Sequence, residues 1–326
     1  MELSVIIVNY KAWNALEDCL NSLVSVFSKF ENLEVIVVDN QSGDGKFAIF
    51  QSKFPQFRFI LNSGNNGFSN GCNLGAKSAR GDFFLFLNPD TTITAETLQH
   101  LSDSYNTHDE IGILSCVQYN ENGTYYKQNL LFPKPYTFFG TFRAVYRTLN
   151  KSKLKQKFTP HNELTYPDWV TGAVVFISKE ILKKINGWNE DYWLYFEDVD
   201  LCKKVVNAGY KVGLLHNTKL FHAHGGASRI NLKTKALTKT EVIISKHTYI
   251  SNHFSPVSKM ITNVILIVSV LIEKSFLSIL SFLFFSNVKL KVNRLILKNL
   301  FNYYISVFNH KTWISPRAMN FKYKVN

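Results

Sequence analysis

Val5-Ile6-Ile7-Val8-Asn9-Tyr10 is a short apolar run that ends in two polar residues. Similar runs, rich in Val, Ile, Phe and Leu, follow at residues 34–38, 57–61 and 83–87. Such runs are typical of strands buried on both faces of a sheet. No basic stretch precedes residues 3–8, so we expect a buried strand there and no secretory signal.

Helical patterns alternate with these strands. A shorter helical segment, from Gly67 to Arg80, lies between the third and fourth runs and is closed by Gly81. Repeated strand–helix–strand units predict a parallel sheet, and such sheets bind ligands at the carboxyl ends of their strands. Between the first two runs, apolar residues spaced by three and four predict one helix face: Trp13, Leu16, Leu20, Leu23 and Phe27.

Polar residues follow three of the predicted strands, at residues 9–10, 39–45 and 88–91. Each ending alone also suits an ordinary turn or a helix cap. Together they place two carboxylates, Asp39 and Asp90, on one edge of one sheet. A nucleotide with a metal-bound diphosphate needs that arrangement, because one carboxylate can accept hydrogen bonds from the nucleoside while the other holds a hard divalent cation.

The second half of the chain has an unusual density of carboxylates. Residues 168–177 are a polar turn followed by a predicted strand, and Lys179 to Ile185 is a predicted helix. Residues 190–200 then hold five carboxylates, and five aromatic residues lie among and beside them. Apolar surroundings raise the pKa of a carboxyl group towards the range of a general base. Alternatively, Glu197 and Asp198 only begin a helix over residues 199–207 and favour its positive end.

His222 and His224 end a further predicted strand and are followed by glycines. Two histidines at this spacing are a weak metal signal, and a lone histidine is more often structural. Beside Asp90, however, one imidazole can complete the coordination of a divalent ion. The four cysteines fit neither a paired zinc spacing nor a disulfide framework, which favours a reduced, cytosolic setting.

The charge of the chain is uneven. The 326 residues are enough for one large domain plus an appendage. Residues 226–326 hold fifteen Lys and Arg against two acids, whereas residues 1–225 hold 22 of each sign. A basic segment favours phosphates, either of nucleic acid or of an anionic membrane surface.

Two apolar stretches, at residues 261–272 and 275–285, decide between these partners. Each is too short to cross a bilayer, and a single helix over both would bury Glu273 and Lys274 in hydrocarbon. We therefore expect helices that lie in the membrane interface, with Lys and Arg towards the headgroups. A helical cap on the main domain and a true span remain alternatives. We expect no nucleic-acid partner, and we interpret the lysine alternation at residues 151–157 as a solvated loop beside the acceptor entrance.

Six motifs, taken in order and spacing, resemble family 2 glycosyltransferases of the GT-A fold, most closely the bacterial rhamnosyltransferase-type members that build cell-surface polysaccharides. The resemblance covers residues 3–228 and implies an α/β domain over 1–228, a Rossmann-like mixed sheet flanked by helices. Residues 229–326 form a basic, apolar helical extension outside it. The motifs are Val5 to Tyr10, Val35 to Ser42, Asn65 to Gly75, Leu87 to Asp90, Thr171 to Ala173 and Phe196 to Leu201.

The resemblance also implies roles. Asp90 is the metal-binding acid for Mg²⁺ or Mn²⁺, with His222 as the first candidate for a histidine ligand and His224 as the second. Asp198 is the catalytic base, with Glu197 beside it. Asn88 stands where many members carry the first metal-binding acid, as in the rhamnosyltransferase-like subset. The implied donor-binding residues are Asn9, Tyr10, Asp39, Asn66, Gly67, Asn73, Asn88, Asp90, Thr171 and Gly172.

The implied reaction is inverting transfer of rhamnose or another hexose from a nucleotide-diphosphate donor. The implied acceptor is a hydroxyl of a polyprenyl-linked or growing polysaccharide. From the basic, apolar extension we expect a cytoplasmic protein that is peripherally attached to the inner face of the cell membrane and so reaches this acceptor. Two alternatives are a nucleotide-sugar-binding scaffold protein without turnover and a nucleotidyltransferase. The latter needs a basic phosphate-binding loop, which the first 90 residues lack. The sequence sets no oligomeric state.

Overall fold

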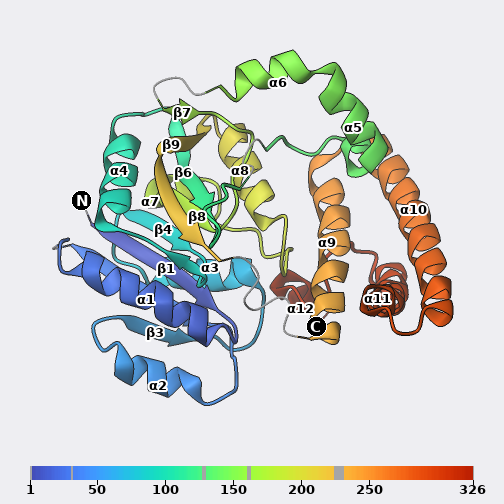
Figure 1. Ribbon diagram of the computed structural model, residues 1–326, viewed down its shortest axis with the longest axis horizontal. Helices are drawn as coiled ribbons and strands as arrows, with labels where there is room; N and C mark the ends of the chain where they lie inside the picture. The colour runs from blue at the N-terminus through green and yellow to red at the C-terminus, as the bar shows by residue number, and fades with distance from the viewer. Residues whose placement is uncertain (1, 31, 127–129, 160–162, 224–230, 326) are drawn as a thin grey trace. The chain divides into compact units, whose positions relative to one another are not determined.

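The computed structural model describes residues 2–30, 32–126, 130–159, 163–223 and 231–325, and its contacts divide the chain into two units (Figure 1). The sheet unit comprises Met1–Phe132, Asn150–Asn189 and Glu197–Ala227. The helical unit comprises Ser228–Asn326 together with two earlier segments, Pro133–Leu149 and Glu190–Phe196. The helical unit therefore draws two pieces of chain from within residues 1–228.

A mixed sheet organises the sheet unit. Among the described residues it has nine strands in the order β3-β2-β1-β4-β8-β6-β9-β5, with β7 paired to β9. β1 pairs in parallel with β2 and β4, and β2 with β3, whereas β8 runs antiparallel to β4 and β6. The predicted α/β class and the four predicted parallel strands are confirmed. The strands are β1 Leu3–Asn9, β2 Leu33–Asp39, β3 Arg58–Leu61, β4 Phe83–Leu87, β5 Thr91–Thr92, β6 Ile111–Tyr119, β7 Leu164–Thr165, β8 Val174–Ser178 and β9 Lys211–His222.

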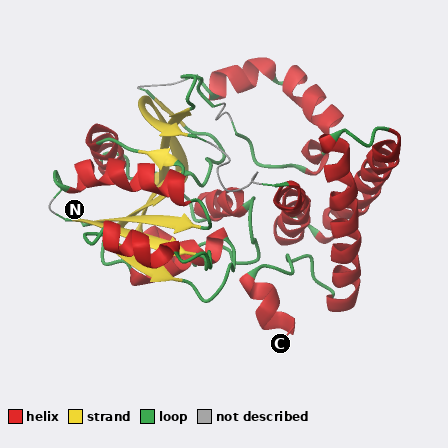
Figure 2. Cartoon of the chain, turned by 60° about the horizontal axis from the view of Figure 1, so that its bottom comes forward, coloured by secondary structure: helices red, strands yellow, loops and turns green. Residues whose placement is uncertain are grey.

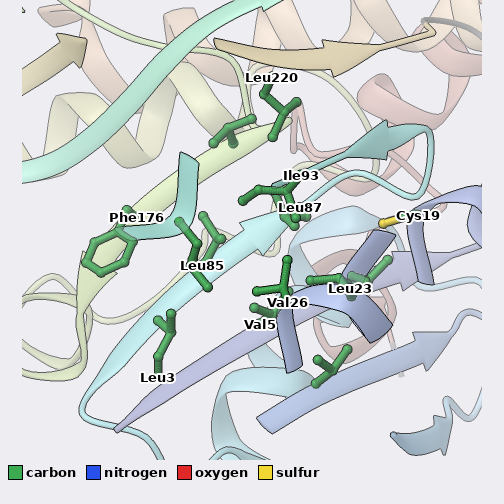
Figure 3. Close-up of a cluster of buried hydrophobic side chains, with 14 of the residues drawn as sticks. Leu3, Val5, Cys19, Leu23, Val26, Leu85, Leu87, Ile93, Phe176 and Leu220 are labelled. Carbon is green, nitrogen blue, oxygen red and sulfur yellow. The ribbon is translucent and has the colours of Figure 1, made fainter. Parts of the chain in front are cut away.

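Helices cover both faces of this sheet because β1 is apolar on both sides. Val5 and Ile7 belong to one buried cluster with Leu16 of α1, part of which Figure 3 shows. Ile6 and Val8 belong to a second cluster with residues of α3, α7 and α8. This alternation is the period-two pattern of a strand. The helices are α1 Trp13–Phe27, α2 Lys46–Lys53, α3 Phe68–Ser78, α4 Ala95–Asn106, α6 Lys151–Lys157, α7 Lys179–Lys184 and α8 Glu197–Asn207.

Two glycines let α3 lie close against β1. A Cβ atom on Gly75 would lie 2.4 Å from Cγ2 of Ile6, and one on Gly71 would lie 2.7 Å from Cγ1 of Val8. Any side chain at these positions would push the helix off the strand. The close approach brings α3 to the carboxyl ends of β1 and β2, where the sequence predicts the donor site.

The helical unit has its own apolar core, formed by α9, α10 and α11. Figure 2 draws helices in red and strands in yellow, and the described residues of this unit contain no strand. Ile243 and Ile250 of α9 pack with Leu266 of α10 and with Ile296 and Leu300 of α11. Spacings of seven along α9 and of four along α11 are those of helices that pack side by side. The elements of the unit are η1 Pro135–Phe138, α5 Gly140–Leu149, α9 Leu232–His253, α10 Pro256–Leu283, α11 Val288–His310 and α12 Met319–Val325.

Two expectations about local structure are corrected. The apolar stretches 261–272 and 275–285 are not separate arms, because α10 is one helix of 28 residues that runs through the first and nearly all of the second. Lys274 Nζ donates to Glu273 Oε1 at 2.6 Å, so the charged pair does not interrupt the helix. The lysines at residues 151–157 form helix α6 rather than a loop, and Lys157 pairs with the carboxylate of Asp168.

Candidate active site

The carboxyl ends of β1 and β2 form the first part of the site. Asn9 and Asp39 are register partners, and Asn9 Nδ2 donates to Asp39 Oδ1 at 2.8 Å. The backbone N–H and hydroxyl of Ser42 also donate to Asp39, at 2.8 and 2.6 Å. Three donors hold this buried carboxylate in one orientation, as a preorganised site requires. Tyr10, the next residue along the chain from Asn9, is 37% exposed.

The N-terminus of α3 lies beside this edge. Asn40 Nδ2 donates to the carbonyl oxygen of Gly67 at 3.0 Å, and Asn62 Nδ2 donates to Asn40 Oδ1 at 2.9 Å. Gly67 has φ 99° and ψ 167°, a conformation that glycine adopts at little cost. Asn66 is buried and donates to Ser63 Oγ at 3.2 Å. Asn66 and Gly67 thus join the edge that carries Asp39.

Asn73 lies further along α3, where its amide bonds the backbone of Trp188. Asn73 Nδ2 donates to the Trp188 carbonyl at 2.9 Å, and Asn73 Oδ1 accepts from the Trp188 N–H at 2.9 Å. This two-way bond ties α3 to the segment before α8. These two bonds use Oδ1 and one proton of Nδ2, and the donor contact predicted for Asn73 stays a prediction.

Asp90 and His222 lie together where β5 pairs with the end of β9. Thr91, at the start of β5, is the register partner of His222 in β9, and the Ala223 N–H donates to the Asp90 carbonyl at 2.9 Å. His222 Nε2 lies 3.2 Å from Asp90 Oδ1, and both side chains are largely buried. Asn88 begins the turn before β5, where its carbonyl accepts from the Thr91 hydroxyl at 2.7 Å.

A hydrogen-bond chain runs from Asp90 towards Asp198. His222 Nδ1 lies 2.8 Å from Gln118 Oε1, and Gln118 Nε2 donates to Thr171 Oγ1 at 2.9 Å. The N–H of the next residue, Gly172, donates to Asp198 Oδ2 at 3.1 Å. The two predicted acids therefore belong to one connected set of residues. Neighbouring strand ends assemble it, although its members are far apart in the sequence.

The Asp90–His222 pair fits a divalent cation. Because Gln118 Oε1 can only accept, His222 Nδ1 carries a proton and donates it. In a neutral ring, Nε2 then presents a lone pair to the Asp90 carboxylate, and two acceptors this close need a proton or a cation between them. The described residues form no group of three or more His, Cys, Asp or Glu side chains around a metal position. Mg²⁺ and Mn²⁺ sites often use few protein ligands and complete the shell with water and phosphate. His224 lies outside the described residues.

Burial raises the pKa values of the two carboxyl groups at the start of α8 to different extents. Removal from water raises the pKa of Asp198 to about 6, and this exceeds the lowering by the N–H groups of Gly172 and Val199. Burial raises the pKa of Glu197 well above its usual range, and the neighbouring Asp198 charge adds to that effect. Burial therefore favours the protonated form of Glu197 more strongly than that of Asp198. Two carboxyl groups with separated pKa values are typical of acid–base sites.

Backbone strain precedes this pair. Tyr195 and Phe196 have φ values of 71° and 68°, in the left-handed region that bulky residues rarely adopt. Such residues cost of order 1–3 kcal/mol each and are concentrated at functional sites. The strained pair lies immediately before Glu197, so the direction in which α8 begins depends on it.

Sequence reasoning missed Gln118 and Asn40 as members of the site. Asn40 directly follows Asp39, and its place at a strand end was a usable signal. Gln118 lies in β6, a strand that the sequence analysis did not identify, so nothing marked it as a partner of a histidine 104 residues further along.

Comparisons with known proteins agree with this geometry. A sequence profile described as "Glycosyl transferase family 2" matches residues 4–176, and one described as "N-terminal domain of galactosyltransferase" matches residues 155–224. The low-salt glycan biosynthesis hexosyltransferase Agl10 of Haloferax volcanii is 27% identical over 220 residues, which cover 65% of this chain and 64% of that protein. The matched region thus spans less than two thirds of that relative.

Two further comparisons concern the rhamnosyltransferase-like subset and the GT-A fold. The N-acetylglucosaminyl-diphospho-decaprenol L-rhamnosyltransferase of Mycobacterium tuberculosis is 22% identical over 68% of this chain and 75% of its own length. The mannosyltransferase PcManGT of Pyrobaculum calidifontis, solved with GDP-Man and Mn²⁺, superposes with a TM-score of 0.51 at 17% identity, over 80% of this chain and 68% of that one. This likeness confirms the GT-A fold. Because the family profile covers 173 of the 326 residues, the chain belongs to glycosyl transferase family 2, and it is similar to the rhamnosyltransferases of that family.

Proposed function

We propose that this protein is an inverting glycosyltransferase that moves rhamnose or another hexose from a nucleotide-diphosphate donor to a hydroxyl of a polyprenyl-linked or growing polysaccharide acceptor. The observation that carries the proposal is the chain from Asp90 through His222, Gln118 and the Thr171–Gly172 backbone to Asp198. It gives one connected site both a diphosphate-facing acid and a base with a raised pKa.

The donor nucleotide is assigned to the edge formed by β1, β2 and the start of α3. Asp39 is held there by Asn9 and Ser42, and an ordered carboxylate suits hydrogen bonds from a base or ribose. Tyr10 offers an exposed ring for stacking at the same edge. PcManGT was solved with GDP-Man, which supports a nucleotide sugar as the class of donor.

The donor diphosphate is assigned to Asp90 and His222. A divalent cation held by these two side chains would offset the negative charge that develops on the departing diphosphate. Gln118 fixes the tautomer of His222 by accepting from Nδ1, so that Nε2 faces Asp90 as a ligand atom. PcManGT was solved with Mn²⁺, which supports Mn²⁺ or Mg²⁺.

The acceptor hydroxyl is assigned to Asp198. As the hydroxyl oxygen bonds to the anomeric carbon, its proton passes to the Asp198 carboxylate, while the bond from that carbon to the diphosphate breaks on the opposite face. The Gly172 and Val199 N–H groups hold the Asp198 carboxylate in place. Attack opposite to the leaving group inverts the anomeric configuration.

The raised pKa of Asp198 predicts the acid limb of the pH profile. Because the base must be ionised and its pKa is about 6, kcat/KM is expected to level off above neutral pH. Below the pKa it should fall by about tenfold per pH unit. Initial rates between mildly acidic and neutral pH, with circular dichroism as a check on folding, measure this limb. A folded protein with the same kcat/KM on both sides of pH 6 would exclude Asp198 as the titrating base.

We place the protein at the inner face of the cell membrane, attached peripherally through α10. Among the described residues, α10 is the one helix long and apolar enough to cross a membrane, and 22% of its most apolar window is buried. Its exposed side carries a continuous apolar stripe that includes Val264, Val268 and Phe276, each more than half exposed. Four basic residues of α11, Lys289, Lys291, Arg294 and Lys298, suit anionic headgroups.

Replacing Val264, Val268 and Phe276 together by serine tests this attachment. Vesicle binding is expected to weaken by at least about tenfold, because three exposed apolar side chains no longer enter the interface. Co-sedimentation with anionic phospholipid vesicles measures it. The matched control replaces Val24, Ile49 and Leu61 of the sheet unit, which are 40%, 63% and 54% exposed. Equal binding by both triple variants would contradict attachment through α10, and resistance of the natural protein to an alkaline carbonate wash would favour a span.

A donor screen tests the proposal as a whole. Nucleotide diphosphates and nucleotide sugars, each with and without Mn²⁺, are compared for thermal stabilisation of the full chain. A ligand that binds the folded state raises the melting temperature with the logarithm of its concentration. The best donor is then supplied with acceptor and nucleoside diphosphate release is followed. Binding without any transfer would favour the scaffold alternative.

A further inference from the structure

The loop Glu190–Phe196 belongs to the helical unit and leads directly into α8, and other segments of the helical unit hold it at several points. Its first half is fixed by polar contacts. Asn320 Nδ2 donates to Asp191 Oδ1 at 2.9 Å, and Asn252 Nδ2 donates to Asp191 Oδ2 at 3.2 Å. The Asn320 N–H also donates to the Glu190 carbonyl, at 3.4 Å. Helices α9 and α12 thus hold the same carboxylate from two directions.

The middle of the loop is packed and hydrogen-bonded. The Trp193 side chain is 9% exposed and lies in a cluster with Ile314, Ala318 and Phe321. Ser245 Oγ, in α9, donates to the Leu194 carbonyl at 2.9 Å. The Trp193 ring is therefore used for packing inside the helical unit.

The end of the loop is held by aromatic rings. The Phe196 ring stacks on Phe138 with centroids 6.4 Å apart, and it lies 5.7 Å from the Tyr249 ring. Tyr195 and Phe196 are the residues with strained backbone, and the next residue is Glu197. A strained conformation persists only where the surroundings enforce it, and these rings supply that enforcement.

The segment that contacts Trp193 is itself fixed to the bundle. The Trp313 carbonyl accepts from Thr248 Oγ1 at 2.8 Å and from the Tyr303 hydroxyl at 2.7 Å. Arg317 lies 3.9 Å from the buried carboxylate of Glu241 and 5.9 Å from the Trp193 ring centroid. Contacts thus run without a break from α9 and α11, through residues 313–320, to the loop.

We propose that the helical unit is a positioning element of the active site: through Ser245 and Asn320 it holds Glu190–Phe196 in the one conformation that starts α8 with Asp198 correctly placed. The inference rests on the proposed function, since it concerns where the base lies. It gives the C-terminal helices a part in turnover that is separate from membrane attachment. Ser245 and Asn320 are positioning residues, because they act on Asp198 through the loop backbone.

The double variant Ser245→Ala/Asn320→Ala tests this role in the full chain. The matched control is Ser281→Ala/Asn299→Ala, which makes the same changes in the same unit. Ser281 bonds within its own helix, and Asn299 donates to Thr240, so neither bond reaches the loop. The test double variant is expected to lower kcat by about 10- to 100-fold, because small displacements of a catalytic group have effects of that size. The dissociation constant for the donor should stay that of the natural protein.

Hydrogen exchange supplies a readout that does not depend on turnover. Amides of residues 190–199 should exchange faster in the test double variant and at the natural rate in the control. Equal kcat in the two double variants, or unchanged exchange over these residues, would overturn the inference. If Asp198→Asn then still abolished sugar transfer, the proposed function would stand without this positioning role. A natural protein that transfers no sugar from any donor would overturn both.

Discussion

Asp198→Asn is expected to bind the nucleotide-sugar donor with natural affinity and to lose turnover by at least about 10²- to 10⁴-fold, the usual contribution of a general base. Asparagine keeps the size of the side chain, and its one amide oxygen can still accept from either the Gly172 or the Val199 N–H group, so the fold should be retained. It cannot take the acceptor proton at the pH where Asp198 is ionised. Initial rates at saturating donor and acceptor, together with donor affinity by calorimetry, measure the two effects separately.

The matched control is Asp103→Asn, the same change at an exposed position of α4. Glu197→Gln gives a second comparison, because burial raises the pKa of Glu197 and so favours its protonated form, which glutamine resembles. We expect its turnover to exceed that of Asp198→Asn by at least about tenfold. Natural turnover in Asp198→Asn, or a greater loss of turnover in Glu197→Gln than in Asp198→Asn, would show that Asp198 is not the base.

Asp90→Asn is expected to lower kcat by about 10²- to 10³-fold, the size of effect seen when one group that stabilises a developing charge is removed. The same variant should lose stimulation by Mn²⁺, because a neutral amide is a weak ligand for a hard cation. Turnover across a Mn²⁺ titration, with nucleoside diphosphate release as the signal, measures both effects. Gln118→Leu should need about 10- to 100-fold more Mn²⁺, because it frees the His222 ring while leaving Asp90 in place.

Asp109→Asn is the control for this series, since Asp109 is exposed in the turn between α4 and β6. If Asp90→Asn kept natural turnover and natural stimulation by Mn²⁺, Asp90 would have no metal role. If a chelator left the natural protein fully active, the divalent-cation part of the proposal would be wrong, while the prediction for Asp198 would stand.

Local patterns in the sequence were enough to locate much of the sheet unit. The strands that end at Asn9, Asp39 and Leu87 are each short apolar runs followed by polar residues, and each lies where that pattern predicts. The apolar face of α1 could also be predicted from the sequence, because the spacing of three and four residues depends only on neighbouring residues. Parallel pairing then brings the strand ends to one edge.

Features that depend on distant contacts could not be predicted in this way. Gln118 bonds a histidine 104 residues away, and Asn320 bonds an aspartate 129 residues away, so no local spacing carries either pairing. The aromatic residues before Glu197 suggest apolar surroundings for a carboxyl group, yet Trp193 packs among C-terminal side chains. The continuity of α10 was also hidden, because the adjacent opposite charges of Glu273 and Lys274 satisfy each other.

The anomeric configuration of the product tests the central claim most directly. The natural protein, Mn²⁺, a donor from the binding screen and a polyprenyl-linked acceptor are incubated, and the new glycosidic bond is examined by nuclear magnetic resonance. A base that acts opposite to the departing diphosphate should give a linkage of inverted configuration, formed together with one nucleoside diphosphate. A retained configuration, or donor cleavage with no sugar on any acceptor, would contradict direct displacement assisted by Asp198.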